Sequence, residues 1–172
     1  MPERTLIWNP NSPTAKRVIL LRHAEKTGQQ GDRGLSPKGH ARAQALASLP
    51  EFLGRIDAII AAKSSNKSAR PVQTVEPLAR ALDLPIETQW DTYDIVDLAT
   101  TVTGDAHGGK QVVICWRHDT IQALAHALGA PDAPVWPADL YDRVWLLTRS
   151  SGGTNLRTLR QHVRTGMLQL EL

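Results

Sequence analysis

The sequence is organised around one stretch, Val18-Ile19-Leu20-Leu21-Arg22-His23-Ala24-Glu25-Lys26. Four apolar residues run without a break and are followed directly by Arg22 and His23. A short continuous apolar run is typical of a strand that is buried on both faces, as in a parallel sheet. Open α/β sheets bind their ligands at the carboxyl ends of such strands. The stretch therefore predicts Arg22 and His23 at the mouth of a site, although this pair alone is equally compatible with a strand end that meets solvent.

A second apolar run ends in the same two residue types. The segment 111–116 predicts another buried strand, and Arg117 and His118 follow it. Further strands are expected at 57–62, 85–88, 142–148 and, as an edge strand, 156–163. Helices are expected where apolar residues recur at helical spacing or where a capping residue precedes a proline. They are the helix that opens at Ser36-Pro37, runs to about Leu49 and stops at Pro50, those over 69–82 and 121–128, and a weakly periodic one over 91–103.

Strands that alternate with helices favour right-handed crossovers and a sheet covered on both faces. The predicted fold is α/β: a three-layer α/β/α sandwich with a mainly parallel sheet. The length of 172 residues suits one domain, and no linker or repeat divides the chain. Residues 1–172 are therefore expected to form a single domain. Residues 1–16, rich in proline and asparagine, are expected to be a surface arm.

Composition narrows the class of protein. The formal net charge of +3 favours anionic partners without naming them. The late arginines are spaced apart rather than packed in a tract, which indicates a solvated face and no nucleic-acid partner. No stretch approaches the ~18 apolar residues of a membrane span, and no signal core follows Met1, so no membrane partner is expected. The single cysteine, Cys115, excludes an internal disulfide and fits a reducing compartment, so a cytoplasmic location is expected.

Four residues are predicted to converge on one edge of the sheet. If the strands before His23 and His118 are neighbours, the two imidazoles face each other across a crevice. Arg70 opens a helix that follows the strand over 57–62, so it reaches the same edge together with Arg22. Guanidinium groups match phosphate oxygens bidentately, and helix-start amides add partial positive charge. The four residues together predict a site for a tetrahedral dianion.

At this point the sequence resembles the histidine phosphatase superfamily of phosphoglycerate-mutase-like proteins. Four segments match its signatures in the family's order: Leu21-Arg22-His23-Ala24-Glu25, Leu35-Ser36-Pro37-Lys38-Gly39, Arg70-Pro71-Val72-Gln73-Thr74 and His118. The resemblance spans most of the chain and implies the phosphoglycerate-mutase-like fold in a small member. It also implies a phosphatase that acts through a phosphohistidine on His23.

The resemblance assigns roles to individual residues. His23 is the implied nucleophile, while Arg22, Arg70 and His118 hold the phosphoryl oxygens. Such a site works by positioning and electrostatic stabilisation, and its arginines take the place of a cation, so no metal or other cofactor is implied. Lys26, at the pocket rim, and Asn66 are expected to be substrate-binding residues. A solvated side chain is the alternative for Lys26, and Asn66 stands where a serine is common in the family.

The general acid is not fixed by the motifs. Mutase-type members carry a glutamate in a Gly-x-Trp-Glu-Gly segment, which this sequence lacks. Asp119 is one candidate, because His-Asp at the second histidine resembles the acid-phosphatase branch. It also stands three residues before Gln122, where it equally suits a helix N-cap. The other candidates are Glu87, Asp91 and Asp94.

The function expected is metal-independent hydrolysis of phosphomonoesters or phosphoprotein groups. The partner is a phosphorylated small molecule or a phosphoprotein, and the sequence does not choose between them or indicate an oligomeric state. Two alternatives stay open. One is a phospho-ligand binding module without turnover, and the other is a phosphoglycerate-type mutase. Ala24, where the family usually has glycine, is a small departure from the motif.

Overall fold

The computed structural model describes residues 15–150 and 152–172. The expected surface arm lies outside the described residues except for its last two positions, of which Ala15 is buried. The strands are β1 (Arg17–Arg22), β2 (Ala58–Ala61), β3 (Ile86–Glu87), β4 (Gln111–Trp116), β5 (Arg143–Ser150), β6 (Gly153–Arg164) and β7 (Met167–Glu171). The helices are α1 (Pro37–Leu46), α2 (Leu49–Leu53), α3 (Arg70–Leu82), α4 (Ile95–Val102) and α5 (Ile121–Ala127), with a 3₁₀ turn, η1, at Asp105–His107.

All seven strands join one sheet in the order β3-β2-β4-β1-β5-β6-β7. The four strands from β3 to β1 are parallel, as the alternation of strands and helices predicted. From β1 onward the pairings are antiparallel. Short turns join β5 to β6 and β6 to β7, and a tight turn can only join antiparallel strands. β1 therefore lies where the parallel part of the sheet meets the antiparallel part.

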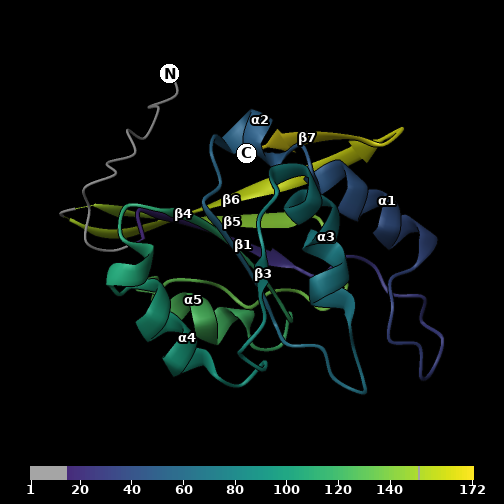
Figure 1. The fold of residues 1–172 in the computed structure, drawn as a ribbon, viewed down its shortest axis with the longest axis horizontal. Helices are drawn as coiled ribbons and strands as arrows, with labels where there is room; N and C mark the ends of the chain where they lie inside the picture. The colour runs from purple at the N-terminus through teal and green to yellow at the C-terminus, as the bar shows by residue number, and fades with distance from the viewer. Residues whose placement is uncertain (1–14, 151) are drawn as a thin grey trace.

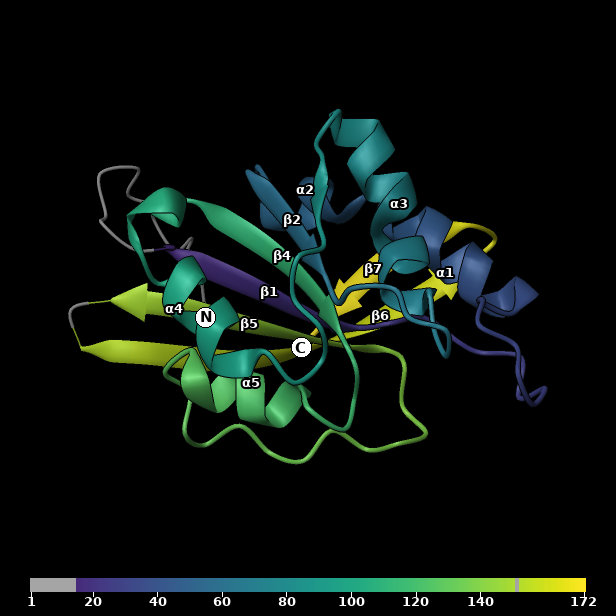
Figure 2. The same ribbon diagram turned by 60° about the horizontal axis from the view of Figure 1, so that its bottom comes forward.

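Helices cover both faces of the sheet, so the three-layer prediction is confirmed. Successive residues of β1 and β4 point to opposite faces, as the strand period of two requires. Val18 and Leu20 pack with α4 and α5, whereas Ile19 and Leu21 pack with α1 and α3. Figure 1 shows α4 and α5 on one side of the sheet and α1, α2 and α3 on the other, and Figure 2 shows the same layers in a turned view.

The helix expected from Ser36 to about Leu49 is two helices. The start is as predicted, since the Ser36 hydroxyl accepts a hydrogen bond from the Gly39 amide at 3.0 Å. However, α1 ends at Leu46, and a second helix begins at Leu49. The prediction that Pro50 stops the helix is wrong, because Pro50 occupies the first turn of α2, where a missing N–H leaves no hydrogen bond broken.

Two further expectations need correction. The helix expected over 91–103 is shorter, because residues 91–94 form a turn and α4 begins at Ile95. The segment after β5 is not an edge strand, since β6 pairs with β5 on one side and with β7 on the other. β7 follows a tight turn in which Thr165 and Gly166 both have positive φ, the geometry of the common two-residue hairpin.

Candidate active site

The two Arg-His pairs lie side by side at one edge of the sheet. β1 and β4 are parallel neighbours in register, with Arg22 opposite Trp116. The pairing continues one residue further, where the His23 amide donates a hydrogen bond to the Trp116 carbonyl at 3.1 Å. Both strands therefore end at the same level. The strands before His23 and His118 are neighbours, which the sequence alone left open.

His23 is buried, and the tautomer of its ring follows from one contact. Its Nδ1 lies 2.7 Å from the Ala24 carbonyl oxygen. A carbonyl oxygen only accepts, so Nδ1 carries the proton and Nε2 of the neutral ring keeps its lone pair. Burial lowers the pKa of His23 to about 4; the Ala24 hydrogen bond opposes this shift, while the nearby positive groups of Arg22, Arg70 and His118 add to it. His23 is thus a neutral imidazole among positive charges.

Arg22 is held by a loop far along the chain. Its Nη1 donates to the Ala138 carbonyl at 2.6 Å and to the Leu140 carbonyl at 2.9 Å. The Tyr141 ring lies against the guanidinium, with 3.8 Å between the ring centroid and Cζ. Nε of Arg22 is buried without a partner in the described part of the chain. Because both Nη1 hydrogens are used by the loop, Nε and Nη2 are the donors left for an anion.

Arg70 opens α3 and reaches back to the loop that follows β1. Its Nε donates to the Gly34 carbonyl at 3.0 Å, and its Nη2 donates to the Asp32 carbonyl. Two residues of the third motif fix this arrangement. Thr74 accepts a hydrogen bond from the Ala24 amide at 2.8 Å and donates to the Arg70 carbonyl, and Gln73 accepts from the Leu35 amide at 3.0 Å. The Arg-x-x-Gln-Thr pattern thus joins α3 to the loop that carries the nucleophile candidate.

The second motif, Leu35-Ser36-Pro37-Lys38-Gly39, ends in a glycine for a steric reason. A Cβ at Gly39 would stand 2.3 Å from the backbone oxygen of Glu25, so only glycine fits where α1 crosses the loop. Glu25 itself is buried and paired with Arg42 at 2.7 Å, which holds the pKa of its carboxyl below the ordinary value despite burial. Ala24 has no positive φ, so the backbone does not need the family's glycine at that position.

His118 and its neighbours are more exposed than His23. Burial lowers the pKa of His118, and the positive charge of Arg22 adds to the shift, while Asp119 opposes it. Asp119 accepts from Arg117 Nη2 at 2.8 Å. The N-cap alternative for Asp119 is wrong, because Thr120 occupies the capping position of α5 and no side chain caps that helix. Asp119 therefore lies within the electrostatic reach of both Arg22 and His118.

The other carboxylate candidates are engaged elsewhere. Glu87 faces His107, with 3.3 Å between its carboxylate and Nε2. Since His107 precedes β4, this contact lies toward the opposite end of the strand from His118. Asp91 and Asp94 accept hydrogen bonds from backbone amides of their own turn. Among the four candidates, Asp119 is the carboxylate that the structure places with the histidines.

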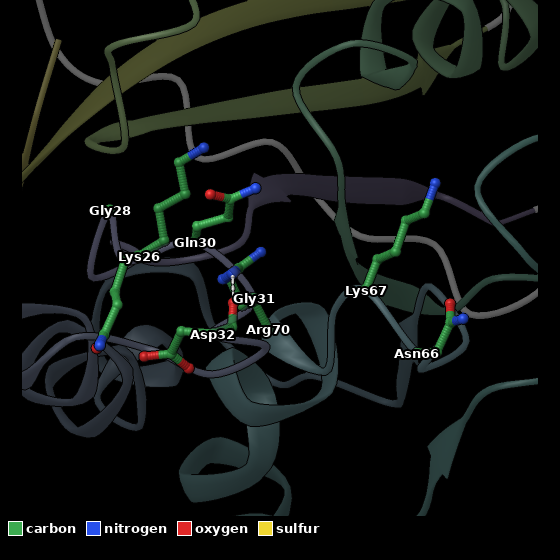
Figure 3. A pocket seen from close by; sticks show the side chains of 9 residues that line it. Lys26, Gly28, Gln30, Gly31, Asp32, Asn66, Lys67 and Arg70 are labelled. Atoms are coloured by element: carbon green, nitrogen blue, oxygen red, sulfur yellow. Dashed lines mark hydrogen bonds between the residues drawn. The ribbon is translucent and has the colours of Figure 1, made fainter.

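A hollow of about 360 Å³ opens beside Arg70, and we call it the basic hollow. It is lined by the loop after β1 and by the loop that leads into α3, with residues Lys26, Gly28, Gln29, Gln30, Gly31, Asp32, Asn66, Lys67 and Arg70. In Figure 3 Lys26 and Lys67 project on opposite sides of Arg70. Lys26 and Asn66 therefore line this hollow, and neither histidine does.

Sequence reasoning missed Tyr141. Its ring contacts Arg22 and stands 6.0 Å, centroid to centroid, from the His23 ring. Tyr141 precedes β5, an antiparallel strand, so the rule that places ligands at the carboxyl ends of parallel strands says nothing about it. The signal available was weaker: a long loop over 129–142 with three prolines, and such long loops often carry functional residues.

Part of the sequence is similar to a known protein superfamily. The model of the histidine phosphatase superfamily (branch 1) matches residues 18–94, which include His23 and Arg70 and end before His118. The resemblance to this superfamily is confirmed. No curated protein matches the chain.

Solved structures share the fold across several activities. The protein histidine phosphatase SixA bound to tungstate has a TM-score of 0.61 and 16% identity, over 84% of this chain and 96% of that one. A phosphoglycerate mutase from Bacillus anthracis gives 0.57 and 13%, over 87% and 94%. A mycobacterial glucosyl-3-phosphoglycerate phosphatase bound to inorganic phosphate gives 0.51 and 21%, over 84% and 95%. The phosphoglycerate-mutase-like fold is therefore shown, and the similar proteins are phosphatases and mutases.

Two kinds of feature are absent from the described residues. Within 15–150 and 152–172, no three His, Cys, Asp or Glu side chains gather as a group that could hold a metal ion. No helix in the described part of the chain has the length and apolar character to cross a membrane.

Proposed function

We propose that this chain, which matches the histidine phosphatase superfamily, hydrolyses phosphate monoesters through a phosphohistidine on His23. One observation carries the proposal: a buried, neutral imidazole with a bare Nε2 stands among Arg22, Arg70 and His118. A lone pair is needed to attack phosphorus, and the surrounding cations favour the anionic phosphoryl group. Similar structures hold tungstate and inorganic phosphate, both tetrahedral oxyanions, which supports the proposal.

In the first step Nε2 of His23 attacks phosphorus, a P–N bond forms and the P–O ester bond breaks. The electron pair leaves on the ester oxygen, which takes a proton from an acid. We assign this acid to Asp119, since it is the candidate whose charge acts on both Arg22 and His118. In the second step water attacks phosphorus, the P–N bond breaks, its electrons return to Nε2, and the water proton passes to the carboxylate. Arg22, Arg70 and His118 neutralise charge in both transition states.

The test is to trap the intermediate. The protein is mixed with a ³²P-labelled phosphate ester, quenched rapidly in alkali and examined by mass spectrometry. We expect an acid-labile phosphoryl group on His23, followed by release of phosphate. His126→Asn serves as the matched control, because His126 lies on α5 with its ring on the Ala133 carbonyl, and it should label normally.

Two results contradict the proposal. Release of phosphate without label on His23 would exclude the covalent route. Tight binding of phosphate esters with neither label nor release would instead identify a phospho-ligand binding module. For the acid, Asp119→Asn should remove the basic-side limb of the pH–rate profile, and Asp94→Asn should leave it in place.

A further inference from the structure

The basic hollow carries more positive charge than a phosphoryl site alone needs. Lys26, Lys67 and Arg70 contribute three cationic groups to its lining. The single acidic lining residue, Asp32, already accepts hydrogen bonds from the Thr27 hydroxyl and the Gly34 amide. The ammonium groups of Lys26 and Lys67 have no acceptor among the described residues. Three cationic side chains therefore stand against one carboxylate in the lining, so the hollow keeps a net positive charge.

The hollow is joined to the proposed phosphoryl site through Arg70. This side chain lines the hollow, and its charge acts on the His23 ring. On the other side, the charge of Lys26 acts on His118. A phosphoryl group held between the two histidines therefore has the basic hollow directly beside it, where the remainder of the substrate can lie.

The shape of the hollow suits a small group rather than an apolar body. Its volume of about 360 Å³ falls at the lower end of ligand sites in proteins. Apart from two glycines, its lining residues carry cationic, amide or carboxylate side chains, and none is aliphatic or aromatic. An apolar leaving group would gain little there, whereas a carboxylate or phosphate would meet unpaired ammonium groups.

We infer that the basic hollow binds a second anionic group carried by the leaving group, so that the preferred substrate is a phosphate ester with two anionic groups. The inference rests on the proposed function and narrows its substrate class. The second anion is a carboxylate or phosphate, and it comes either from a small metabolite or from acidic residues that flank a phosphorylated side chain. Lys67, which no motif singles out, becomes a specificity-determining residue.

The experiment compares substrate pairs that differ by one anionic group. The small-molecule pair is 3-phosphoglycerate and glycerol 3-phosphate, and the peptide pair is a phosphoserine peptide flanked by aspartates or by asparagines. The variant is Lys67→Glu, and its matched control is Lys63→Glu, which changes the same charge on the same exposed loop outside the hollow. Both kcat/KM and, by calorimetry, the Kd of each ligand are measured.

We expect the wild-type protein to prefer the more anionic member of at least one pair in both Kd and kcat/KM. Lys67→Glu should weaken that preference about tenfold, as reversal of one partly screened charge implies, and Lys63→Glu should leave it within about twofold. High salt should also narrow it. A preference confined to one pair identifies the source of the anion.

Failure of the inference differs from failure of the proposed function. Turnover of all four ligands without preference, or an equal effect of Lys67→Glu on both members of each pair, overturns the inference and leaves the phosphatase. A binding preference that Lys67→Glu removes, without any turnover, upholds the hollow and overturns the phosphatase.

Discussion

The same dipeptide ends β1 and β4 in very different surroundings. Arg22 and His23 are buried, with 2% and 5% of their surfaces exposed. Arg117 and His118 are half-exposed, and the Arg117 guanidinium forms an ion pair with the neighbouring Asp119 carboxylate. Arg22 is instead held by two carbonyls and the ring of Tyr141 from a loop more than a hundred residues away. The first pair is fixed by the fold, whereas the second is fixed by its own neighbours.

This difference agrees with the two roles proposed for the histidines, nucleophile for His23 and charge stabilisation for His118. A nucleophile needs a neutral ring in one tautomer and one orientation, which burial and the Ala24 carbonyl give to His23. A group that only stabilises charge tolerates more freedom, and His118 has it. The comparison therefore predicts that equivalent changes at the two strand ends have unequal effects.

The largest inequality is expected between the histidines. His23→Ala removes the group that forms the P–N bond, so kcat for a generic phosphate ester should fall by roughly 10⁴-fold or more. His118→Ala removes one stabilising group, so the loss should be roughly 10²- to 10³-fold. Steady-state kinetics with p-nitrophenyl phosphate measures both. Equal losses at the two positions would contradict the division of roles.

The second-largest difference is expected between Arg22 and Arg117. Arg22→Ala leaves the Ala138 carbonyl without its donor, while the Leu140 carbonyl keeps a hydrogen bond from Trp136 Nε1, so the free energy of unfolding should fall by about 1–3 kcal/mol. Its kcat/KM should also fall by roughly 10²-fold or more. Arg117→Ala breaks a half-exposed ion pair and should change stability by less than about 1 kcal/mol. Urea denaturation checks both variants, and a larger stability loss in Arg117→Ala would reverse the comparison.

Acid should destabilise the protein through His23. Its folded pKa of about 4 lies below the ordinary value of 6.5, so below pH 6.5 the unfolded chain binds a proton that the folded chain does not. Stability is therefore lost as the pH falls from 6.5 to 4, by roughly 3 kcal/mol from this group. Urea denaturation at several pH values should show a shallower loss in His23→Asn, which cannot titrate. An unchanged slope would mean that His23 is charged in the folded protein.

The smallest effect is expected at Tyr141. Tyr141→Leu removes the ring that lies on Arg22 and beside His23, and kcat/KM should fall about tenfold, in line with a partly buried cation–π contact. Tyr141→Phe keeps the ring and should stay within about threefold of the wild type. If Tyr141→Phe lowers kcat/KM as much as Tyr141→Leu does, the contribution comes from the hydroxyl and not from the ring.

Local sequence patterns predict much of this structure. Apolar runs located β1 and β4, and Ser36-Pro37 located the start of α1, because each is set by residues adjacent in sequence. The site residues named by motif arrive at the same edge for the same reason, since each directly follows or opens an element. Parallel pairing of β1 with β4 then brings the histidines together.

The remainder depends on contacts that no local pattern encodes. The Ala138 carbonyl that binds Arg22 lies 116 residues along the chain, and Gln161, which accepts a hydrogen bond from Arg42, lies 119 residues from it. Tyr141 reaches the site from a loop whose path only the folded protein defines. β7 was missed because its five residues form a strand only against β6.

The position of β1 between β4 and β5 also governs when the molecule can assemble. Arg17 pairs with Gln111 on one side and Thr148 on the other, so both partner strands of β1 are synthesised long after it. Contacts of such long sequence separation slow folding. Until residues 111–116 and 143–150 are both made, at least one edge of this apolar strand stays unpaired and prone to aggregation. The candidate active site that follows β1 can therefore take its final form only after residues 143–150 have been synthesised.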